Sequence, residues 1–515
     1  MAESRTTKSL KNAEVSVIYY TLNLIVGFWA RKVFYDYLGA EVLGLDTTAY
    51  SLLGFLNLAE LGVGGAVAFF LYQPMFNKDT LTINEIVALQ GWIYRRIAFV
   101  IMAASCILMC FFPVIFKDIH LPMWYPYATF LVILFGSLLG YFVNYRQCVL
   151  YADQKSYKVT RVTSGATLAF RIILILILPY VPSPFIFYIG TNLLGSIFAS
   201  VWLDHVLKKE YPWLHHAELK GTQLLKKYPG ILKKTSQLFF HQITYFIVFQ
   251  CSPLIMYAFT SLTTIAYYGN YLTIIDKAKY VLNMAFNSTQ AAVGNLIASH
   301  DKQHSLDVYW EMLDSRMAIS TGFLLVLGLI TEPFISVWLS PSYLLGHSVL
   351  FLIVLNSWLM INRTTTDNYI NGYGLYQDIW APIAEAVINF GSAILFGHFW
   401  GIAGVLLGTT ISTLTIVYIW KPYFLFSKGF KINPWKYFFK KILWRYILVG
   451  MNVVVFIEMN NLLRPKTIHG FSGVLVYGVV VSMVILPAVY ILFYCFTPGT
   501  KRFSKRMLHL ITSRL

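Results

Sequence analysis

The sequence predicts an all-α integral membrane protein with about fourteen transmembrane helices, and its composition is the first reason. Of the 515 residues, 57% are hydrophobic and only 12% are charged, whereas a soluble domain typically carries about 25% charged residues. The mean hydropathy is +0.61, and apolar segments of about 20 residues, the length that crosses a bilayer, recur along the chain. These observations exclude a soluble enzyme, a disordered chain and a small disulfide-stabilised domain.

The apolar segments are long, and short connections join them. The first lacks a small-residue cleavage site, which favours a retained helix over a removed signal peptide. Tight joins at 179–182 and 397–400 predict antiparallel neighbours, and the eighth segment is long enough to kink or to extend into the cytoplasm. The predicted spans are 13–35, 47–72, 97–116, 124–145, 159–179, 184–207, 235–259, 262–297, 317–339, 346–370, 379–397, 400–426, 442–459 and 471–496.

The distribution of positive charge orients the chain. With a cytoplasmic N-terminus, 30 of the 40 Lys and Arg residues fall in cytoplasmic elements and five in external ones. This bias predicts that both termini are cytoplasmic and that the number of spans is even. Because the charge is spread over seven cytoplasmic elements, it indicates anionic membrane lipids as partners and excludes nucleic acid.

The longest basic connection divides the predicted spans into two halves. We expect a six-helix lobe in 1–207, a basic cytoplasmic linker in 208–234 and a second six-helix lobe in 235–426. Two further transmembrane helices and a basic cytoplasmic tail occupy 427–515. Two halves in the same orientation imply a pseudo-two-fold axis along the membrane normal and a site near the midplane between them.

Glycine pairs predict close helix contacts. Gly136 and Gly140 form one small-xxx-small pair, Gly404 and Gly408 form another, and three glycines cluster in 62–65. Helix packing is the simplest interpretation of such pairs.

Catalytic and cofactor motifs are missing from the sequence. The five cysteines are scattered, with no CxxC pair and no Cys/His cluster, so neither a disulfide framework nor a metal site is predicted. There is no P-loop, GxSxG or HExxH motif. We therefore expect a protein that is not an enzyme and has no cofactor.

Four stretches carry a family resemblance. Residues 38–45 (LGAEVLGL), 58–66 (LAELGVGGA), 385–389 (EAVIN) and 401–410 (GIAGVLLGTT) resemble bacterial polysaccharide-biosynthesis membrane proteins. These are the Wzx-type lipid-linked oligosaccharide flippases of the multidrug/oligosaccharidyl-lipid/polysaccharide exporter superfamily. The resemblance implies two six-helix lobes with alternating access. It also implies transfer of undecaprenyl-diphosphate-linked repeat units from the cytoplasmic to the periplasmic leaflet of the bacterial inner membrane.

Two alternatives stay open. One is a cation-coupled drug or metabolite antiporter of the same superfamily. The other is a membrane glycosyltransferase or polymerase, which the short external connections disfavour. For a flippase, the polysaccharide polymerase and assembly proteins are candidate partners beside the lipid-linked oligosaccharide itself.

Cations at membrane depth are the candidate substrate-binding residues, because a buried charge is costly and needs a reason. Lys277 and Lys279 lie in the eighth span, one of those that line the central cavity in the superfamily, and suit a diphosphate head group. Arg363 and Arg31 are further candidates for the same group. The structural alternatives are a local pair of Lys279 with Asp276 and snorkelling of Arg31.

Carboxylates at membrane depth are the candidates for ion coupling. Glu60 lies in the glycine-rich part of the second span, and Glu385 lies near the cytoplasmic end of the eleventh. Asp367 follows Arg363 by four residues, so the two share a helix face. A structural ion pair between them is as good an interpretation as a functional one.

Overall fold

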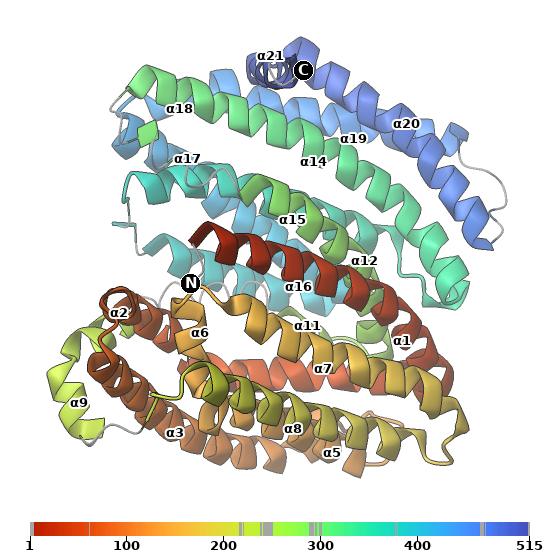
Figure 1. Ribbon diagram of the computed structural model, residues 1–515. Helices are drawn as coiled ribbons and strands as arrows, with labels where there is room; N and C mark the ends of the chain where they lie inside the picture. Colours follow the sequence, from red (N-terminus) through yellow and green to blue (C-terminus); the bar gives the residue numbers. More distant parts are fainter. Residues whose placement is uncertain are drawn as a thin grey trace. The chain divides into compact units, whose positions relative to one another are not determined.

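The computed structural model describes residues 5–60, 62–215, 219, 221–236, 239, 251–287, 293, 296–297, 301–375, 377–378, 380–463, 468 and 470–512. Every regular element within these residues is a helix (Figure 1). The chain divides into two compact units. Unit 1 comprises Met1–Tyr257 and Ser261–Ala266, and unit 2 comprises Ala258–Thr260 and Tyr267–Leu515.

Unit 1 is a bundle of long helices joined by short ones. The helix α1 packs along α7, α7 packs along α8, and α5 packs against both α1 and α8. The elements are α1 (Arg5–Leu56), η1 (Asn57–Glu60), α2 (Val63–Asn77), α3 (Thr80–Cys110), α4 (Phe112–Ile115), α5 (Trp124–Phe142), η2 (Asn144–Gln147), α6 (Cys148–Ala152), α7 (Ser156–Ile177), η3 (Leu178–Tyr180), α8 (Pro184–Glu210), α9 (Gly221–Lys227) and α11 (Ser252–Tyr257).

The first helix turns at a glycine. Gly39 has φ 80° and ψ 171°, outside the helical region, so α1 consists of two helices. Phe34, before the turn, and Asp46, after it, both contact Tyr188. The apolar part of α1 is the 46-residue stretch Lys11–Leu56. As a straight helix it would be about 69 Å long, more than twice the thickness of the hydrocarbon core of a bilayer, which is about 30 Å. The turn makes this stretch compatible with two crossings.

The predicted second span, 47–72, is not one helix. It ends as α1 at Leu56, passes through the 3₁₀ turn η1 and resumes as α2 at Val63. Gly62 precedes α2 with φ 93°, a conformation that favours glycine. The glycine cluster therefore marks a break in the span, where backbone polar groups need protein or water as partners.

Unit 2 is built around the long helix α14. Its elements are α12 (Leu262–Asn287, whose first turns belong to unit 1), α14 (Lys302–Trp338), η4 (Pro341–Tyr343), α15 (His347–Gly372), α16 (Trp380–Ser412), α17 (Lys421–Phe424), α18 (Pro434–Tyr437), α19 (Leu443–Leu463), α20 (Gly470–Phe496) and α21 (Pro498–Thr512), with π-helical turns η5 (Thr413–Trp420), η6 (Leu425–Phe430) and η7 (Phe438–Ile442). The helix α14 packs against α15, α19, α20 and α21.

A second glycine reversal divides α16. Gly401 has φ 55° and ψ −129°, which folds the helix into a hairpin. A Cβ on Gly404 would lie 1.9 Å from the carbonyl oxygen of Phe396, and one on Gly408 would lie 2.6 Å from the backbone nitrogen of Ala393. The close contact predicted for Gly404 and Gly408 is confirmed, and it joins the two arms of this hairpin.

The described helices make the chain a multi-pass membrane protein. Among the described residues, nine helices are long and apolar enough to cross a membrane, and two of these contain the reversals at Gly39 and Gly401. The predicted seventh span, 235–259, lies largely outside the described residues. The count of fourteen spans stays a prediction.

Basic residues gather at one end of unit 1. Lys8 Nζ lies 2.6 Å from Asp153 Oδ1, and Lys155 Nζ lies 2.7 Å from Glu210 Oε1, which joins the start of α1 to the α6–α7 connection and the end of α8. Burial raises the pKa of Asp153, but hydrogen bonds from Lys155, Lys8 and Tyr211 outweigh it, so the pKa lies below the ordinary value.

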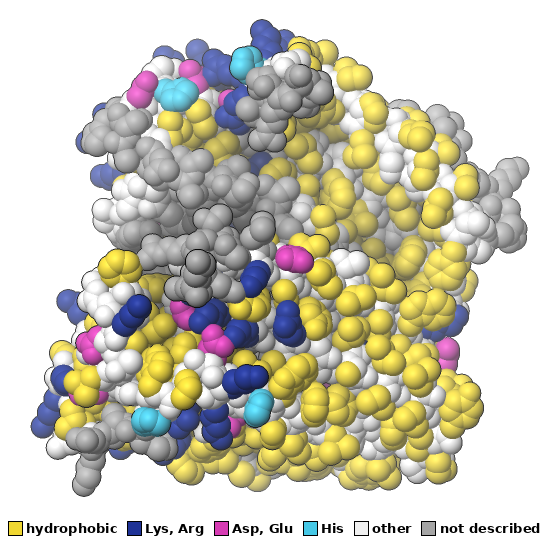
Figure 2. All heavy atoms as spheres, viewed as in Figure 1, with side chains coloured by type: hydrophobic (Ala, Val, Ile, Leu, Met, Phe, Trp, Pro, Cys, Tyr) yellow, Lys and Arg dark blue, Asp and Glu magenta, His cyan; other side chains and the backbone are white. Residues whose placement is uncertain are grey.

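We call this region the basic end of unit 1. Lys227 Nζ, 2.7 Å from Glu85 Oε2, adds α9 to it. Figure 2 shows Lys and Arg side chains gathered here over the part of unit 1 where α6, α8 and α9 lie in Figure 1, beside a largely hydrophobic surface. The residues that define it are Lys8, Arg95, Arg146, Lys155, Lys158, Lys208 and Lys227.

Candidate functional site

Unit 2 contains a cluster of four charged side chains. Arg363 Nε lies 3.1 Å from Asp367 Oδ2, one turn further along α15, and Arg363 Nη1 lies 3.2 Å from Glu385 Oε1 on α16. Lys421 Nζ, at the start of α17, lies 2.6 Å from Asp367 Oδ1. The four side chains are between 4% and 26% exposed. We call this group the Arg363 cluster; with two cations and two carboxylates, it is electrically neutral.

Neighbouring polar residues orient the cluster. Asn362 donates to Ser320 Oγ on α14 at 2.9 Å, and the hydroxyl groups of Thr366 and Tyr309 lie 3.2 Å apart. These bonds hold one face of α15 against α14, so Arg363 and Asp367 face α16 and α17. The polar stretch predicted to need a protein or water environment is therefore in contact with protein.

An irregular helix positions Lys421. This residue stands between the π-helical turns η5 and η6, in a segment that continues α16. Short π-helical turns occur frequently at functional sites, because they rotate the side chains that follow them. Sequence reasoning placed Lys421 at the cytoplasmic end of a span and missed its ion pair, which connects residues 54 positions apart.

In unit 1, Glu60 lies in the break between α1 and α2. Tyr94 donates to Glu60 Oε1 and Tyr141 donates to Oε2, both at 2.7 Å. Tyr141 Oη is also 3.1 Å from Asn57 Oδ1. Among the described residues, no Lys or Arg forms an ion pair with Glu60. The Glu60 carboxylate is therefore held by neutral tyrosine hydroxyl donors.

A polar cavity adjoins this break. It has a volume of about 560 Å³ and is lined by Tyr50, Asn57, Ser137, Gly140 and Asn192, among others. A Cβ on Gly140 would meet nothing within 4 Å, whereas one on Gly136 would lie 3.1 Å from Ser196 Oγ. Of the first predicted glycine pair, only Gly136 makes a close contact; Gly140 lines the cavity.

Asp46 is a further candidate functional residue, and it is not among those that the sequence predicts. Tyr188 donates to Asp46 Oδ1 at 2.8 Å, and Arg31, on the other side of the turn at Gly39, interacts electrostatically with the same carboxylate. Arg31 Nη2 also donates to the carbonyl oxygen of Ala266 at 3.3 Å. Asp46 immediately precedes the predicted second span, so it was assigned to a connection. The turn at Gly39 brings Asp46 to Tyr188, which also contacts Phe34 before the turn.

The lysines of α12 lie beside an acidic neighbour. Lys279 Nζ is 2.5 Å from Asp276 Oδ1, three residues earlier, so the local pair considered from the sequence is present. Lys277 is exposed, and Lys279 is partly buried. The structure places neither lysine in the Arg363 cluster.

A second buried ion pair joins the last helices to α14. Arg445 on α19 binds Asp314 through Nε and Nη2, with 2.9 Å from Nη2 to Oδ2, and the backbone N–H of Gly499 on α21 donates to the same oxygen at 2.9 Å. Asp314 is fully buried. Arg316, which the sequence places in a cytoplasmic connection, is also buried in α14, and its Nη2 donates to the carbonyl oxygen of Phe286 at 2.9 Å.

Metal ligands do not cluster in the part of the chain that the structure describes: no group of three His, Cys, Asp or Glu side chains there is arranged to hold an ion. The sites defined by the structure are thus buried carboxylates and ion pairs inside helical bundles. Together with the apolar spans, they are typical of a multi-pass membrane transporter.

Comparison with solved structures identifies the fold. The lipid II flippase MurJ, in an inward closed conformation, superposes with a TM-score of 0.64 and 13% sequence identity, over 93% of this chain and 98% of that chain. An inward-facing multidrug resistance MATE family transporter of the MOP superfamily gives a TM-score of 0.56 at 14% identity, over 84% of this chain and 95% of its own. The outward-facing conformation of a MATE family transporter gives a TM-score of 0.51 at 14% sequence identity, over 86% of this chain and 96% of that chain.

The chain therefore has the transporter fold shared by MurJ and the MATE proteins of the MOP superfamily, which is the fold that the resemblance predicts. No protein family profile matches the sequence, and no curated protein sequence matches it.

Proposed function

We propose that the protein translocates undecaprenyl-diphosphate-linked oligosaccharide repeat units from the cytoplasmic to the periplasmic leaflet of the bacterial inner membrane. The product would supply capsule, O-antigen or exopolysaccharide synthesis, with the polymerase and assembly proteins as partners. The observation that carries the proposal is the likeness to a lipid II flippase over 93% of this chain, against 84% for the inward-facing MATE transporter. The greater likeness to the flippase favours a lipid-linked substrate over a small drug.

The Arg363 cluster supplies a way to couple ions to the head group. When Asp367 and Glu385 are ionised, they neutralise Arg363 and Lys421, and no positive charge is left for a phosphate. If both carboxylates take up protons, two cations become available, and charge-assisted hydrogen bonds to a diphosphate can form. Release of the protons restores the ion pairs and displaces the phosphate.

This exchange satisfies the requirement for coupling. A ligand shifts an equilibrium between two conformations only as far as it binds them differently. In the proposal, protons and diphosphate bind the Arg363 cluster together. The conformation in which the two carboxylates are ionised has low affinity for the substrate. Arg31 in unit 1 and Lys277 and Lys279 in unit 2 are further candidate cations for head-group binding.

Glu60 is the proposed ion-coupling carboxylate of unit 1. Two tyrosine hydroxyls donate to its carboxylate, and a cavity lined by the neighbouring Asn57 adjoins the break in which it lies. Because no Lys or Arg among the described residues pairs with Glu60, uptake of a proton would turn a negatively charged site into a neutral one.

The test is to delete the gene in its host and to locate the lipid-linked repeat units in sealed vesicles with a membrane-impermeant glycan-modifying reagent. We expect them to accumulate in the cytoplasmic leaflet and to return to the outer leaflet when the gene is restored. Normal outward distribution in a host without a second flippase would refute the proposal.

Variants then test the residue assignments at matched protein levels in the membrane. Arg363→Ala and Lys277→Ala are expected to reduce flipping, while Arg502→Ala, which removes a half-exposed surface cation of α21, is the matched control. Full activity of both test variants would refute the head-group assignment without refuting the flippase proposal.

A cation-coupled drug or metabolite antiporter is the second candidate. The MATE likeness and the partly buried carboxylates Glu60 and Asp46 favour it. It predicts that cells without the gene become sensitive to cationic drugs while their lipid-linked repeat units are distributed normally.

A further inference from the structure

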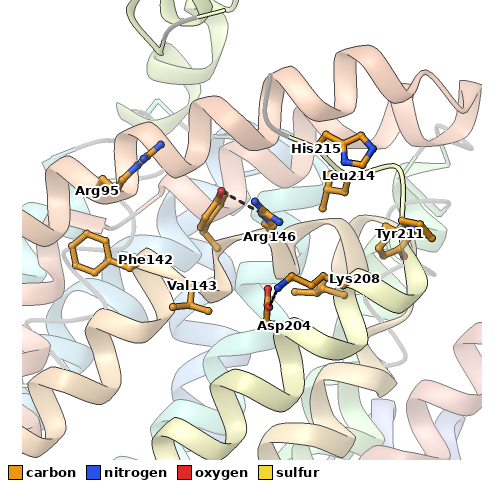
Figure 3. Close-up of a pocket in the computed structure, with 12 residues that line it drawn as sticks. Arg95, Phe142, Val143, Arg146, Asp204, Lys208, Tyr211, Leu214 and His215 are labelled. Carbon is orange, nitrogen blue, oxygen red and sulfur yellow. Dashed lines mark hydrogen bonds and ion pairs between the residues drawn. The ribbon is translucent and has the colours of Figure 1, made fainter. Parts of the chain in front are cut away.

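A pocket at the basic end of unit 1 is separate from the sites described above. It has a volume of about 790 Å³ and lies between α3, η2, α8 and the segment after α8. Figure 3 shows Arg95, Arg146 and Lys208 around it, with His215 at its edge. Glu60 is not among the residues that line it.

Two arginines in this pocket have no acidic partner among the residues that the structure describes. Arg95 donates through Nε to the carbonyl oxygen of Gly91 at 3.1 Å, and Arg146 donates through Nε to Tyr145 Oη at 3.3 Å. Across the described ranges, neither forms an ion pair with a carboxylate. Their terminal nitrogens therefore present the planar donor pattern that matches a phosphate.

The remaining charges do not cancel the arginines. Asp204, the one carboxylate among the lining residues, already has a partner: Lys208 Nζ lies 2.6 Å from Asp204 Oδ2 (Figure 3). Among the described Lys, Arg, Asp and Glu side chains that line the pocket, the net charge is two positive charges, those of Arg95 and Arg146. An anionic ligand suits such a pocket.

Exposed apolar side chains continue from the pocket on two helices. Phe99 follows Arg95 by one turn of α3 and is 61% exposed, and Val201 precedes Asp204 by one turn of α8 and is 63% exposed. Phe142, which lines the pocket, contacts Phe99 with ring centroids 6.0 Å apart. On α3 the apolar side chain comes after the charged one and on α8 before it, so in both helices it lies nearer the middle of the predicted spans 97–116 and 184–207.

We propose that this pocket binds the phosphate of an anionic phospholipid in the cytoplasmic leaflet. Arg95 and Arg146 hold the phosphate, and the acyl chains lie along the apolar faces of α3 and α8. Free phosphate has no apolar part that could contact the adjoining apolar surface, so this surface favours a lipid over free phosphate. Basic pockets between helices on the cytoplasmic side are where anionic head groups bind. This inference does not depend on the transported substrate.

The test compares lipid binding to the purified full-length protein in an uncharged detergent, by native mass spectrometry. Dioleoyl phosphatidylglycerol, dioleoyl phosphatidylcholine and inorganic phosphate are the three probes. We expect phosphatidylglycerol to bind about tenfold more tightly than phosphatidylcholine, a difference of about 1.4 kcal/mol. The double variant Arg95→Gln/Arg146→Gln should lose this preference.

The matched control removes two charges from the same region without touching the pocket. Arg96→Gln/Lys209→Gln changes exposed neighbours on α3 and α8 that do not line it, and it should keep the preference. If the control variant loses as much of the preference for phosphatidylglycerol as the test variant does, diffuse surface charge explains the binding and the proposal fails. If excess inorganic phosphate displaces phosphatidylglycerol from the wild type, the pocket takes free phosphate and the lipid assignment fails.

The single variant Arg95→Gln keeps the test valid if the double variant does not fold. Arg95 is exposed, so its replacement should leave the thermal unfolding temperature unchanged while it weakens the lipid preference severalfold. An unchanged preference in this variant, with Arg146→Gln also unchanged, would overturn the proposal.

Discussion

Replacement of Asp314 by alanine tests how the last helices are attached to unit 2. The carboxylate accepts hydrogen bonds from Arg445 on α19 and from the backbone N–H of Gly499 on α21, and it is fully buried. Asp314→Ala leaves the Arg445 guanidinium, 6% exposed, without its anionic partner. Loss of one partner of a buried ion pair costs about 3–5 kcal/mol. We therefore expect a large loss of stability.

Thermal unfolding of the purified full-length chain in one detergent measures this loss. Tryptophan fluorescence is a suitable signal, because Arg445 lies over the ring of Trp310 at 4.4 Å from the ring centre. The control is Asp307→Ala on the same helix. Asp307 is 38% exposed and its partner Arg502 51% exposed, so that pair contributes at most about 1 kcal/mol.

A double variant separates loss of the pair from loss of packing. Asp314→Ala with Arg445→Leu removes both charges, and replacement of a buried pair by apolar groups is often neutral or stabilising. We expect it to unfold at a higher temperature than Asp314→Ala alone. The reasoning is refuted if Asp314→Ala unfolds at the same temperature as Asp307→Ala.

Four further predictions follow from other sites. Glu60→Gln should fold normally but lose the ion dependence of transport, because an amide binds no proton in this pH range; transport in vesicles with and without an imposed gradient measures it. Glu385→Gln should shift the pH dependence of head-group binding, since it removes one of the two titratable partners of the Arg363 cluster. Gly404→Ala should lower the unfolding temperature, because its Cβ would lie 1.9 Å from a carbonyl oxygen. The lowered pKa of Asp153 means that its ion pairs stabilise unit 1 above the ordinary pKa of aspartate, about 3.9, and that this stability is lost as the pH falls through the lowered value.

A control variant, a test variant or a refuting outcome accompanies each of these predictions. Gly140→Ala matches Gly404→Ala, since its Cβ would meet nothing within 4 Å and little change is expected. Asp153→Asn should be less stable than the wild type at neutral pH and should flatten the acid limb of the stability curve. An unchanged ion dependence in Glu60→Gln would remove Glu60 from the coupling scheme, and an unchanged pH dependence in Glu385→Gln would remove Glu385.

Features within one helix could be predicted from the sequence. Residues three or four apart share a helix face, and the pairs Arg363–Asp367 and Asp276–Lys279 are both present. The exact extent of each helix was less predictable. The span expected over 47–72 breaks at 57–62, since hydropathy averages over a turn and does not register a glycine with positive φ.

Contacts between helices could not be predicted from the sequence. The predicted spans place Asp46 in a connection, yet it accepts a hydrogen bond from Tyr188, 142 residues away. Lys421 was assigned to a span end, yet it pairs with Asp367. Periodicity gives the face of a residue, but its partner depends on how far each neighbouring helix is rotated and shifted along its axis.

The sequence by itself determined that the chain is a multi-pass helical membrane protein, because hydropathy and the length of apolar segments are local properties. It also predicts which charges lie at membrane depth. Only the tertiary structure decided what those charges contact: Glu60 two tyrosine hydroxyls, and Arg363 two carboxylates on different helices. The physical reason is that a buried charge is stable only with its partners in place, and helix packing brings those partners from distant parts of the chain.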